Sequence, residues 1–206
     1  SGELASGLDG MGRMEEPEQI AAIINQYFLD KASFKNLKIL ISAGPTYESI
    51  DPVRFIGNHS SGKMGFSIAL EAAKKGAQVE LITGPTAQKI SHPQISRIDV
   101  TSSQEMLDAC LSYFKQSDIT IMSAAVADYR PKEVSNKKIK KSTNTLNIDL
   151  EPTVDILKML GNLKSSDQFL CGFALETENE ESNAQNKLIN KNLDMIVLNS
   201  LRDEGA

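Results

Sequence analysis

Short strand-like segments alternate with helical segments across residues 37–200, and this alternation limits the possible folds more than any other feature. The strand-like segments are rich in Ile, Leu and Val, whereas the segments between them carry apolar residues at helical spacing. The expected strands are 37–43, 77–83, 95–100, 118–127, 146–151, 168–175 and 194–200, and the expected helices are 62–76, 102–116, 153–163 and 179–193. This alternation predicts an α/β fold with a doubly wound, mostly parallel, Rossmann-like sheet.

Ligands of such sheets bind at the carboxyl ends of the strands, where loops meet helix N-termini. The loops that follow residues 37–43, 118–127 and 168–175 are therefore expected to line one crevice. The apolar character of residues 118–127 is nearly continuous, which is typical of a central strand covered on both faces. Candidate functional residues are thus sought first in these three loops.

The stretch GNHSSGKMG, which begins at Gly57, nearly matches a phosphate-binding loop. It has the G-x-x-x-x-G-K spacing, but Met64 stands where a magnesium-binding Ser or Thr is required. Gly57 also lies 14 residues beyond Ala43, whereas a Walker loop follows its strand directly. Two interpretations remain: a helix N-terminus whose amides attract an anion, with Ser60 or Ser61 as cap, or an ordinary capped helix.

Arg54 and Asn58 lie in the long loop between the first strand and this helix. Arg54 suits either an ion pair with Glu48 or Asp51 in the same loop or a bidentate contact with a phosphate or carboxylate. The Asn58 amide offers one acceptor and two donors, so it suits polarising a carbonyl or an acyl-phosphate oxygen without exchange of a proton. A turn-forming asparagine is the simpler alternative.

The segment SAAVADYRP places small residues at a strand end. Ala124 and Ala125 would let a flat or extended ligand lie against the backbone, and Asp128 could accept a hydrogen bond from an amine or a sugar hydroxyl. A surface turn would account for Asp128 equally well. This segment is a second candidate for ligand contact.

Two groups of lysines suit an anionic ligand. Residues 137–141 have the sequence KKIKK, which is typical of a solvated loop but also suits a mobile segment over a triphosphate. Lys187 and Lys191 are spaced to share one helix face, where either solvent or a common anion would separate their charges. The sequence leaves both interpretations open for both groups.

Charge and composition argue against several other functions. The net charge of -5 and the pI near 5.2 disfavour a surface that coats nucleic acid. No apolar run approaches the roughly 18 residues of a membrane span, and no export signal is evident. Cys110 and Cys171 lie in apolar segments, where buried free thiols are expected, and His59 and His92 form no zinc or triad pattern. We therefore expect a cytoplasmic protein that binds neither nucleic acid nor membrane and has no metal site built from side chains.

Residues 1–34 differ in character from the rest of the chain. The first dozen residues are rich in Gly and Ser and show no period. Acidic residues and a proline then precede an apolar pattern that predicts a helix from near Glu15 to before Ser33. We expect residues 1–34 to form a tail and linker helix before a main domain of residues 35–206.

Several longer motifs resemble one enzyme family. The segments ISAGPTYESIDPVRFIGNHSSGKMG, AAVADYRP, KIKK, GFALET and KNLDMIVLN closely resemble, in this order, the phosphopantothenate–cysteine ligase (phosphopantothenoylcysteine synthetase) domain of the bacterial bifunctional coenzyme A biosynthesis protein. The resemblance spans residues 37–201, and it implies a ligase domain of residues 35–206 that stops before the last strands of the family.

The head of the chain resembles the end of the flavin-dependent decarboxylase domain that precedes the ligase in that bifunctional protein. Residues 1–34 are accordingly interpreted as a stub of the decarboxylase domain and a linker helix. Ser6 stands where many decarboxylases have a catalytic cysteine. Decarboxylation is therefore not expected here, and FMN is expected only in the missing decarboxylase domain.

The family activates the carboxylate of 4'-phosphopantothenate with CTP and magnesium, giving an acyl-cytidylate and pyrophosphate. The amine of L-cysteine then displaces CMP and forms the amide, so the chemistry needs no nucleophilic side chain. The resemblance implies CTP, 4'-phosphopantothenate and L-cysteine as partners. It also implies a homodimer, with the basic segment near the site of the partner protomer. Residues 146–151 and the basic run lie outside the regular alternation of strands and helices, as a small dimerisation arm would.

The resemblance also assigns individual residues. Asn58 matches the essential asparagine of the family, and Lys138 matches the lysine of a flexible lid over the triphosphate, so these two are the expected catalytic residues. The expected nucleotide-binding residues are Met122, Ser123, Ala124, Ala125, Asp128, Lys138, Val154, Asp155, Ile156, Leu157, Phe173, Lys187 and Lys191. The family often has Asn-Pro-Asp where this chain has Thr153, Val154 and Asp155.

Two other function classes compete with the ligase. An NAD(P)-dependent oxidoreductase would use the same kind of sheet, but no G-x-G-x-x-G follows the first strand. A non-catalytic assembly module is the third class, because the stub joined a larger oligomer in the parent protein.

Overall fold

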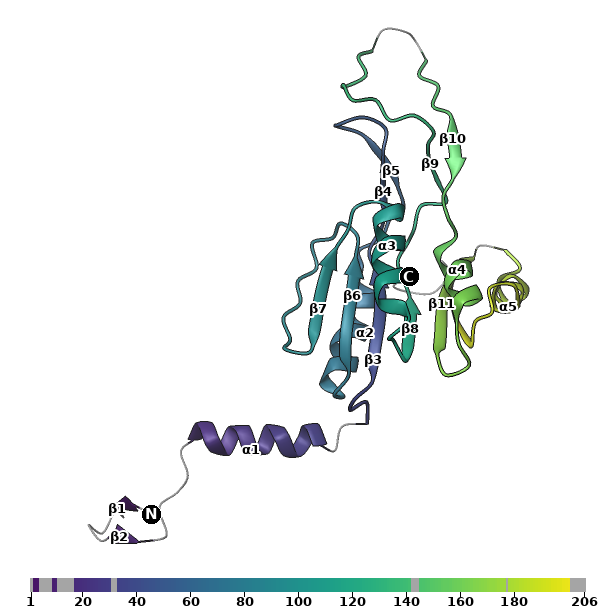
Figure 1. Cartoon of the computed structure of the whole chain (residues 1–206). Helices are drawn as coiled ribbons and strands as arrows, with labels where there is room; N and C mark the ends of the chain where they lie inside the picture. Colours follow the sequence, from purple (N-terminus) through teal and green to yellow (C-terminus); the bar gives the residue numbers. More distant parts are fainter. Residues whose placement is uncertain are drawn as a thin grey trace.

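The computed structural model describes residues 2–3, 9–10, 17–30, 33–141, 145–176 and 178–200. Its centre is a six-stranded sheet with the order β12-β11-β8-β3-β6-β7 (Figure 1). All neighbouring strands in this sheet are parallel. The strands are β3 (Lys38–Ala43), β6 (Gln78–Thr83), β7 (Ile95–Asp99), β8 (Ile119–Met122), β11 (Phe169–Glu176) and β12 (Met195–Ser200).

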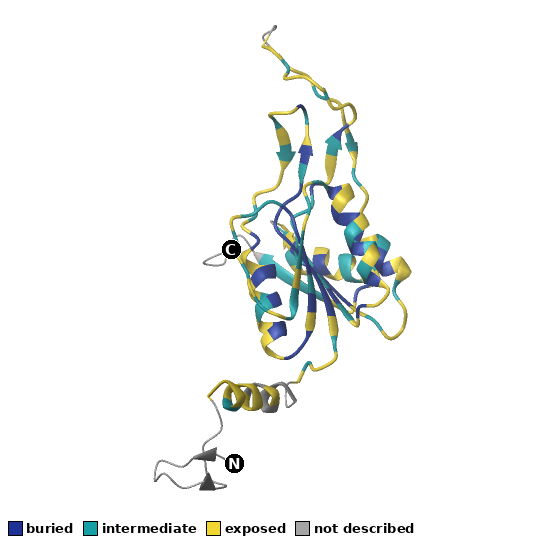
Figure 2. Cartoon of the chain, turned by 60° about the vertical axis from the view of Figure 1, so that its left-hand side comes forward, coloured by how far each residue is buried: buried dark blue, intermediate teal, exposed yellow. Residues whose placement is uncertain are grey.

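Helices cover both faces of this sheet, because alternate strand residues point to opposite sides. Ile39 and Ile41 of β3 join a buried cluster with the helix α2, whereas Leu40 between them joins a second cluster with α3 and α4. The central strands are accordingly buried along most of their length (Figure 2). The helices are α2 (Lys63–Lys74), α3 (Ser103–Phe114), α4 (Ile156–Leu163) and α5 (Glu180–Asn190). The predicted doubly wound α/β fold is confirmed.

The strand order reverses between β3 and β8. From β3 the chain builds outward to β6 and β7, then crosses to β8 and builds the other way to β11 and β12. Neighbouring loops diverge at such a reversal, which is where doubly wound sheets bind ligands. The carboxyl ends of β3 and β8 therefore mark the candidate site.

Two short antiparallel ladders extend beyond this end of the sheet and form an arm (Figure 1). One pairs β4 (Tyr47–Ser49) with β5 (Phe55–Gly57), and the other pairs β9 (Tyr129–Pro131) with β10 (Leu150–Pro152). The rings of Tyr47 and Phe55 stack with centroids 3.9 Å apart across the first ladder. We define the arm as residues 47–57, 129–141 and 145–152.

Three details differ from the sequence prediction. The expected strand 118–127 is only four residues long as β8, because the chain then runs beside the loop after β3, with an isolated bridge between Pro45 and Ala125. The expected strand 146–151 is wrong in extent, because the observed strand β10 begins only at Leu150. It pairs with β9, in a segment that was not expected to form a strand. The loop before α2 contains the β4–β5 hairpin, which the sequence analysis missed.

The N-terminal region contains α1 (Pro17–Asp30), which confirms the predicted helix, and a small ladder of β1 (Gly2–Glu3) and β2 (Asp9–Gly10). Ile23 and Ile24 of α1 are 65% and 49% exposed. Ser6 and residues 201–206, on which two expectations rest, lie outside the described residues. Within the described ranges, none of the helices combines the length and apolarity that crossing a bilayer requires.

Asp194, just before β12, ties three parts of the fold together. Its carboxylate accepts hydrogen bonds from the Leu170 N–H at 2.7 Å and from Lys164 Nζ at 2.8 Å. Burial raises the pKa of Asp194, but these hydrogen bonds lower it by more, so the pKa lies below its ordinary value of 3.8. A carboxyl group with a lowered folded pKa stabilises the fold above the unfolded pKa and loses that contribution as pH falls through the folded pKa.

We therefore expect Asp194→Asn to lower the free energy of unfolding by about 1 kcal/mol at pH 7. The difference from the wild type should persist down to about pH 4 and shrink below it. Urea unfolding at pH 7, 5 and 3 measures this. Asp167→Asn is the control, because Asp167 is exposed and contacts the neighbouring Ser166 hydroxyl. A loss of unfolding free energy that is as large at pH 3 as at pH 7 would contradict the role assigned to the Asp194 carboxylate.

Candidate functional site

The loops after β3 and β8 run side by side beyond the sheet. The Ala125 N–H donates to the Gly44 carbonyl at 2.9 Å, and the Thr46 N–H donates to the Ala125 carbonyl at 3.3 Å. Thr46 Oγ1 also accepts a hydrogen bond from the Ala127 N–H at 2.9 Å. The two loops therefore continue the parallel pairing of their strands, which gives the candidate site a fixed wall.

The predicted nucleotide contacts at the end of β8 lie on this wall. Met122 is buried in the core, whereas Ser123, Ala124 and Ala125 are half-buried. Ser123 Oγ donates to the Ser42 carbonyl at 2.6 Å, and Ser42 Oγ accepts from the Ala124 N–H at 3.2 Å. Asp128 is exposed at the start of the arm. The small side chains of this segment thus lie at the switch point of the sheet.

Asn58 reaches the same segment from the opposite loop. Its Nδ2 atom donates to the Val126 carbonyl at 2.9 Å and lies 3.5 Å from the Ala125 carbonyl. The second contact is at the limit of a hydrogen bond, so this N–H can turn to another acceptor at little cost. The residue itself is exposed. The structure therefore brings Asn58 together with Ala125 and Val126 just beyond the end of β8.

The first turn of α2 packs closely on these strand ends. A Cβ atom on Gly65 would lie 2.6 Å from Ala43 Cβ and 2.7 Å from Ser123 Oγ, so the expected close approach is present. Gly62 is the N-cap with φ 74°, and no side chain caps the helix. The expectation that Ser60 or Ser61 is the cap is therefore wrong, because a left-handed residue occupies that position.

Both serine side chains nevertheless accept hydrogen bonds from backbone N–H groups near the start of α2. The Gly62 N–H donates to Ser60 Oγ and the Lys63 N–H donates to Ser61 Oγ, each at 3.3 Å. These bonds are long, so an anion could replace them. The β4–β5 hairpin lies between β3 and α2. The motif therefore differs from a Walker loop, which follows its strand directly.

Arg54 forms an ion pair within its own loop. Its NH2 group lies 2.8 Å from Asp51 Oδ2, which supports the structural alternative from the sequence analysis. The side chain of Glu48, the other proposed partner, instead accepts a hydrogen bond from the Ser103 N–H at 2.8 Å. Lys138 is exposed on the arm, in the run 137–141.

The loop before α4 and the helix α5 contribute two ion pairs. Asp155 caps α4 by accepting from the Lys158 N–H at 3.0 Å, and it pairs with Lys191 Nζ at 2.8 Å. Burial raises the pKa of Asp155, but the bonds from Lys191 and from the Lys158 N–H outweigh it, so the pKa lies below its ordinary value. Lys187 pairs with Glu176 at 3.3 Å. The two lysines thus each face a carboxylate.

The other residues expected near the nucleotide differ in exposure. Val154 is 42% exposed, whereas Ile156 is 3% exposed and packs in the core. Leu157 covers Gly172, where an added Cβ would lie 2.7 Å from Leu157 Cδ2. Phe173 is half-buried in β11. The side chains of Ile156 and Leu157 therefore pack inward, and their backbone amides form the first turn of α4.

The acidic, histidine and cysteine side chains of the described residues bear on metal and thiol chemistry. Among these residues, no three His, Cys, Asp or Glu side chains gather where they could hold a metal. Asp51, Asp155 and Glu176 are each paired with a cation. Such a set of donors fits a magnesium ion held mainly by triphosphate oxygens and water. Both cysteines are buried and free, and burial raises the pKa of the Cys110 thiol to about 12.

The sequence analysis named Glu48 and Asp51 as possible partners of Arg54 but did not expect them to be buried. Glu48 and Asp51 are only 4% and 3% exposed, although both lie in a polar loop. The available signal was the alternation of Tyr47, Ser49, Phe55 and Gly57 around a proline-containing turn, which is typical of a hairpin. A hairpin would have placed Glu48 within its first strand and Asp51 in its turn.

Comparison with known proteins identifies relatives over the whole chain. The family model of the DNA/pantothenate metabolism flavoprotein C-terminal domain matches residues 34–206. The chain is 50% identical over 210 residues to the "Cysteine/Cysteine sulfinic acid decarboxylase" of an unknown prokaryotic organism, covering 100% of this chain and 58% of that protein. It is 48% identical over 202 residues to the "Coenzyme A biosynthesis bifunctional protein CoaBC" of Haemophilus influenzae, covering 98% of this chain and 50% of that protein. The chain therefore spans about half the length of the curated relatives it matches.

Solved structures give the same result. The crystal structure of the C-terminal domain of CoaBC has a TM-score of 0.71 and 48% identity, with 81% of this chain and 78% of that chain covered. The DNA/pantothenate metabolism flavoprotein of Streptococcus pneumoniae has a TM-score of 0.73 and 26% identity, with 82% and 85% covered. From its sequence and its fold alike, the chain belongs to the family of DNA/pantothenate metabolism flavoprotein C-terminal domains and is homologous to the ligase domain of CoaBC.

Proposed function

We propose that this chain is a phosphopantothenate–cysteine ligase unit of coenzyme A biosynthesis. It joins 4'-phosphopantothenate and L-cysteine through an acyl-cytidylate, uses CTP, and releases CMP and pyrophosphate. The observation that carries the proposal is the meeting of Asn58 with the segment from Ser123 to Asp128 at the switch point, in a homologue of the CoaBC ligase domain. An NAD(P)-dependent oxidoreductase is not favoured, because the relatives are coenzyme A biosynthesis proteins.

The proposed chemistry requires positioning and charge stabilisation. The substrate amine is the nucleophile, so the protein must hold the activated carbonyl and stabilise the oxyanion that forms on attack. Asn58 is assigned to the acyl group, because its weakly held N–H faces the crevice wall. The half-buried Ser123, Ala124 and Ala125 are assigned to the nucleotide.

The triphosphate requires cations, because pyrophosphate leaves with high negative charge. Lys138, Lys187 and Lys191 are assigned to it, and the last two exchange their carboxylate partners for phosphate oxygens on binding. Magnesium, when bound, would supply charge neutralisation, and triphosphate oxygens and water would be its main ligands. Before the nucleotide binds, Asp155 holds the side chain of Lys191 in place and Glu176 holds that of Lys187.

Pyrophosphate release tests this assignment. We expect release that depends on CTP, magnesium and 4'-phosphopantothenate, amide formation only after L-cysteine is added, and a preference for CTP over ATP. Thermal stabilisation by CTP with magnesium, but not by NAD(P), should accompany it. Carbon dioxide released from cysteine sulfinic acid without pyrophosphate would instead support the activity named for the prokaryotic relative.

A homodimer through the arm is part of the proposal. Each arm ladder has two strands, which alone are marginally stable in water. The arm exposes large apolar side chains, with Phe55 51%, Tyr129 55% and Val134 54% exposed. A second copy of the arm would extend the ladders and cover these side chains.

Sedimentation velocity tests the dimer. We expect Phe55→Glu to weaken association at least about tenfold, because it places a charge in an apolar interface. Ile189→Glu is the control, since Ile189 is 73% exposed on α5, outside the arm. A monomeric wild type, or equal loss in both variants, would count against the arm as the interface.

A further inference from the structure

The lysine-rich residues 137–141, which we call the lysine strap, are fixed to the β4–β5 hairpin at Ile139. The Ile139 N–H donates to Asp51 Oδ2 at 3.1 Å, and the Ile139 carbonyl accepts a hydrogen bond from the Arg54 guanidinium. Arg54 and Asp51 pair with each other at 2.8 Å. One ion pair, with a buried carboxylate and a partly exposed guanidinium, therefore holds both backbone polar groups of a single strap residue, 88 positions away from Asp51.

The surroundings of Asp51 suit a fixed anchor. Its side chain has 0% relative exposure, and Oδ1 accepts from the N–H groups of Val53 at 2.8 Å and Arg54 at 2.9 Å. Burial raises the pKa of Asp51, but the hydrogen bonds from the three N–H groups and the charge of Arg54 lower it by more. The carboxylate is thus ionised at neutral pH, and Oδ2 is left for Ile139 and the Arg54 guanidinium.

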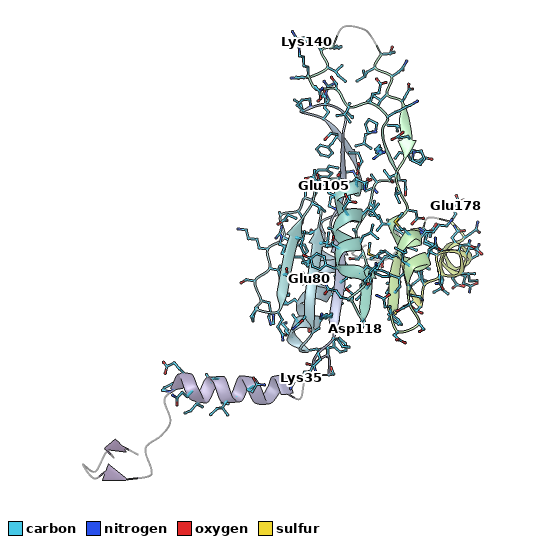
Figure 3. All side chains as sticks on the ribbon, viewed as in Figure 1. Lys35, Glu80, Glu105, Asp118, Lys140 and Glu178 are labelled. Carbon is cyan, nitrogen blue, oxygen red and sulfur yellow. The ribbon has the colours of Figure 1, made fainter. Side chains whose placement is uncertain are left out.

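The strap itself presents cations. All four of its lysines are exposed, whereas Ile139 is half-buried. Lys138 and Lys140 flank the anchored residue directly, and Lys140 lies at the far end of the arm from the sheet (Figure 3). A lysine side chain has a long flexible stem, so the position of its ammonium group depends on how well the backbone is held.

We propose that Asp51 is a positioning residue that holds the lysine strap at the end of the arm, so that in the proposed homodimer Lys138 meets the triphosphate in the site of the partner subunit. The role at the triphosphate rests on the proposed function, whereas the anchoring of Ile139 stands on the hydrogen bonds alone. Asp51 does not touch the reacting atoms in this proposal. It acts through the backbone of Ile139.

Glu48 provides a matched control in the same hairpin. It is as buried as Asp51, and it also accepts a backbone N–H from a distant segment, that of Ser103 at the start of α3. It makes no hydrogen bond to the strap among the described contacts. Asp51→Asn and Glu48→Gln both remove a buried charge from the hairpin, but only Asp51→Asn removes a charge that contacts the strap.

Limited proteolysis with trypsin measures release of the strap, because trypsin cleaves after lysine. We expect Asp51→Asn to be cut after the strap lysines roughly tenfold or more faster than the wild type, the factor that losing a hydrogen bond to a charged group implies. Glu48→Gln should be cut there at the wild-type rate. Equal acceleration in both variants, or no acceleration in Asp51→Asn, would overturn the proposal.

Amide hydrogen exchange in the wild type tests the anchor without any substitution. We expect the Ile139 N–H to exchange at least about tenfold more slowly than the N–H groups of Lys138 and Lys140, since it is bound to a buried carboxylate. Equal exchange at the three positions would overturn the anchor, even if Asp51→Asn failed to fold.

Kinetics separate this proposal from the proposed function. With an active wild type, Asp51→Asn should raise KM for CTP about tenfold and leave KM for L-cysteine unchanged, whereas Glu48→Gln should not produce this split. An unchanged KM for CTP with a released strap would refute the role at the triphosphate. An inactive wild type would refute the proposed function, and proteolysis and exchange would still decide whether Asp51 is the anchor.

Discussion

Asn58→Ala is expected to lower kcat for amide formation by about 10²–10³-fold, the effect of losing one preorganised donor to an oxyanion. The Asn58 amide nitrogen is held against the Val126 carbonyl at 2.9 Å, whereas its contact with the Ala125 carbonyl is a weak 3.5 Å, so one of its two N–H groups is only weakly held. Alanine removes both donors without filling the crevice. The fold should persist, because Asn58 is exposed.

The experiment divides the reaction into its two steps. Pyrophosphate release with CTP and 4'-phosphopantothenate reports activation, and release of CMP on addition of L-cysteine reports amide formation. We expect the second step to be lost and the first to be reduced less, because Asn58 is assigned to the acyl group. Asn162→Ala is the control, since Asn162 is exposed near the end of α4. Normal turnover by the Asn58→Ala variant would show that Asn58 is not an active-site residue.

Gly84→Ala is expected to lower the free energy of unfolding by about 3 kcal/mol or more. A Cβ atom on the buried Gly84 would collide with the backbone carbonyl of Pro45, which a side-chain rotation cannot relieve. Pro45 in turn bridges to Ala125, so the collision would be transmitted to the site wall. Thermal unfolding should show a drop in Tm of roughly 6–12 °C for a domain of this size.

Gly62→Ala gives a graded comparison. Gly62 has φ 74°, and a Cβ there would lie 3.3 Å from the Gly44 N atom. The left-handed backbone costs a side chain about 1–2 kcal/mol, and the contact is mild. Gly84→Ala should therefore destabilise the fold more than Gly62→Ala. The reverse order would mean that the loops after β3 and β6 are not packed as described.

The alternation of apolar strands and helices was enough to predict the fold, because each strand of a parallel sheet must be followed by a crossover. The carboxyl ends of the strands then located the site. The β4–β5 hairpin was missed, because its short strands pair outside the sheet and bury acids rather than apolar residues. Glu48 and Asp51 look like ordinary loop acids in the sequence, and only their partners at Ser103 and Ile139 reveal them.

The ion pairs of Lys187 and Lys191 were also beyond sequence reasoning. The spacing of Lys187 and Lys191 showed that they share a helix face, but their carboxylate partners come from β11 and from the loop before α4. The predicted cap of α2 was wrong for a local reason, because the N-cap residue is Gly62, in a left-handed conformation that serine does not favour. Asn58, Asp128 and the lysines were candidates from their loops and spacing, but their roles came only from family resemblance, because a polar loop residue carries no periodic signal.

The burial of both thiols bears on how such a protein would coexist with free cysteine. Thiol–disulfide exchange requires an accessible thiolate, and burial raises the pKa of Cys110 to about 12 and the pKa of Cys171 above its ordinary value. Neither sulfur is therefore set up to attack cystine or to be captured as a mixed disulfide. Under the proposed ligase function, both thiols would thus stay inert toward cystine, the oxidised form of the proposed L-cysteine substrate.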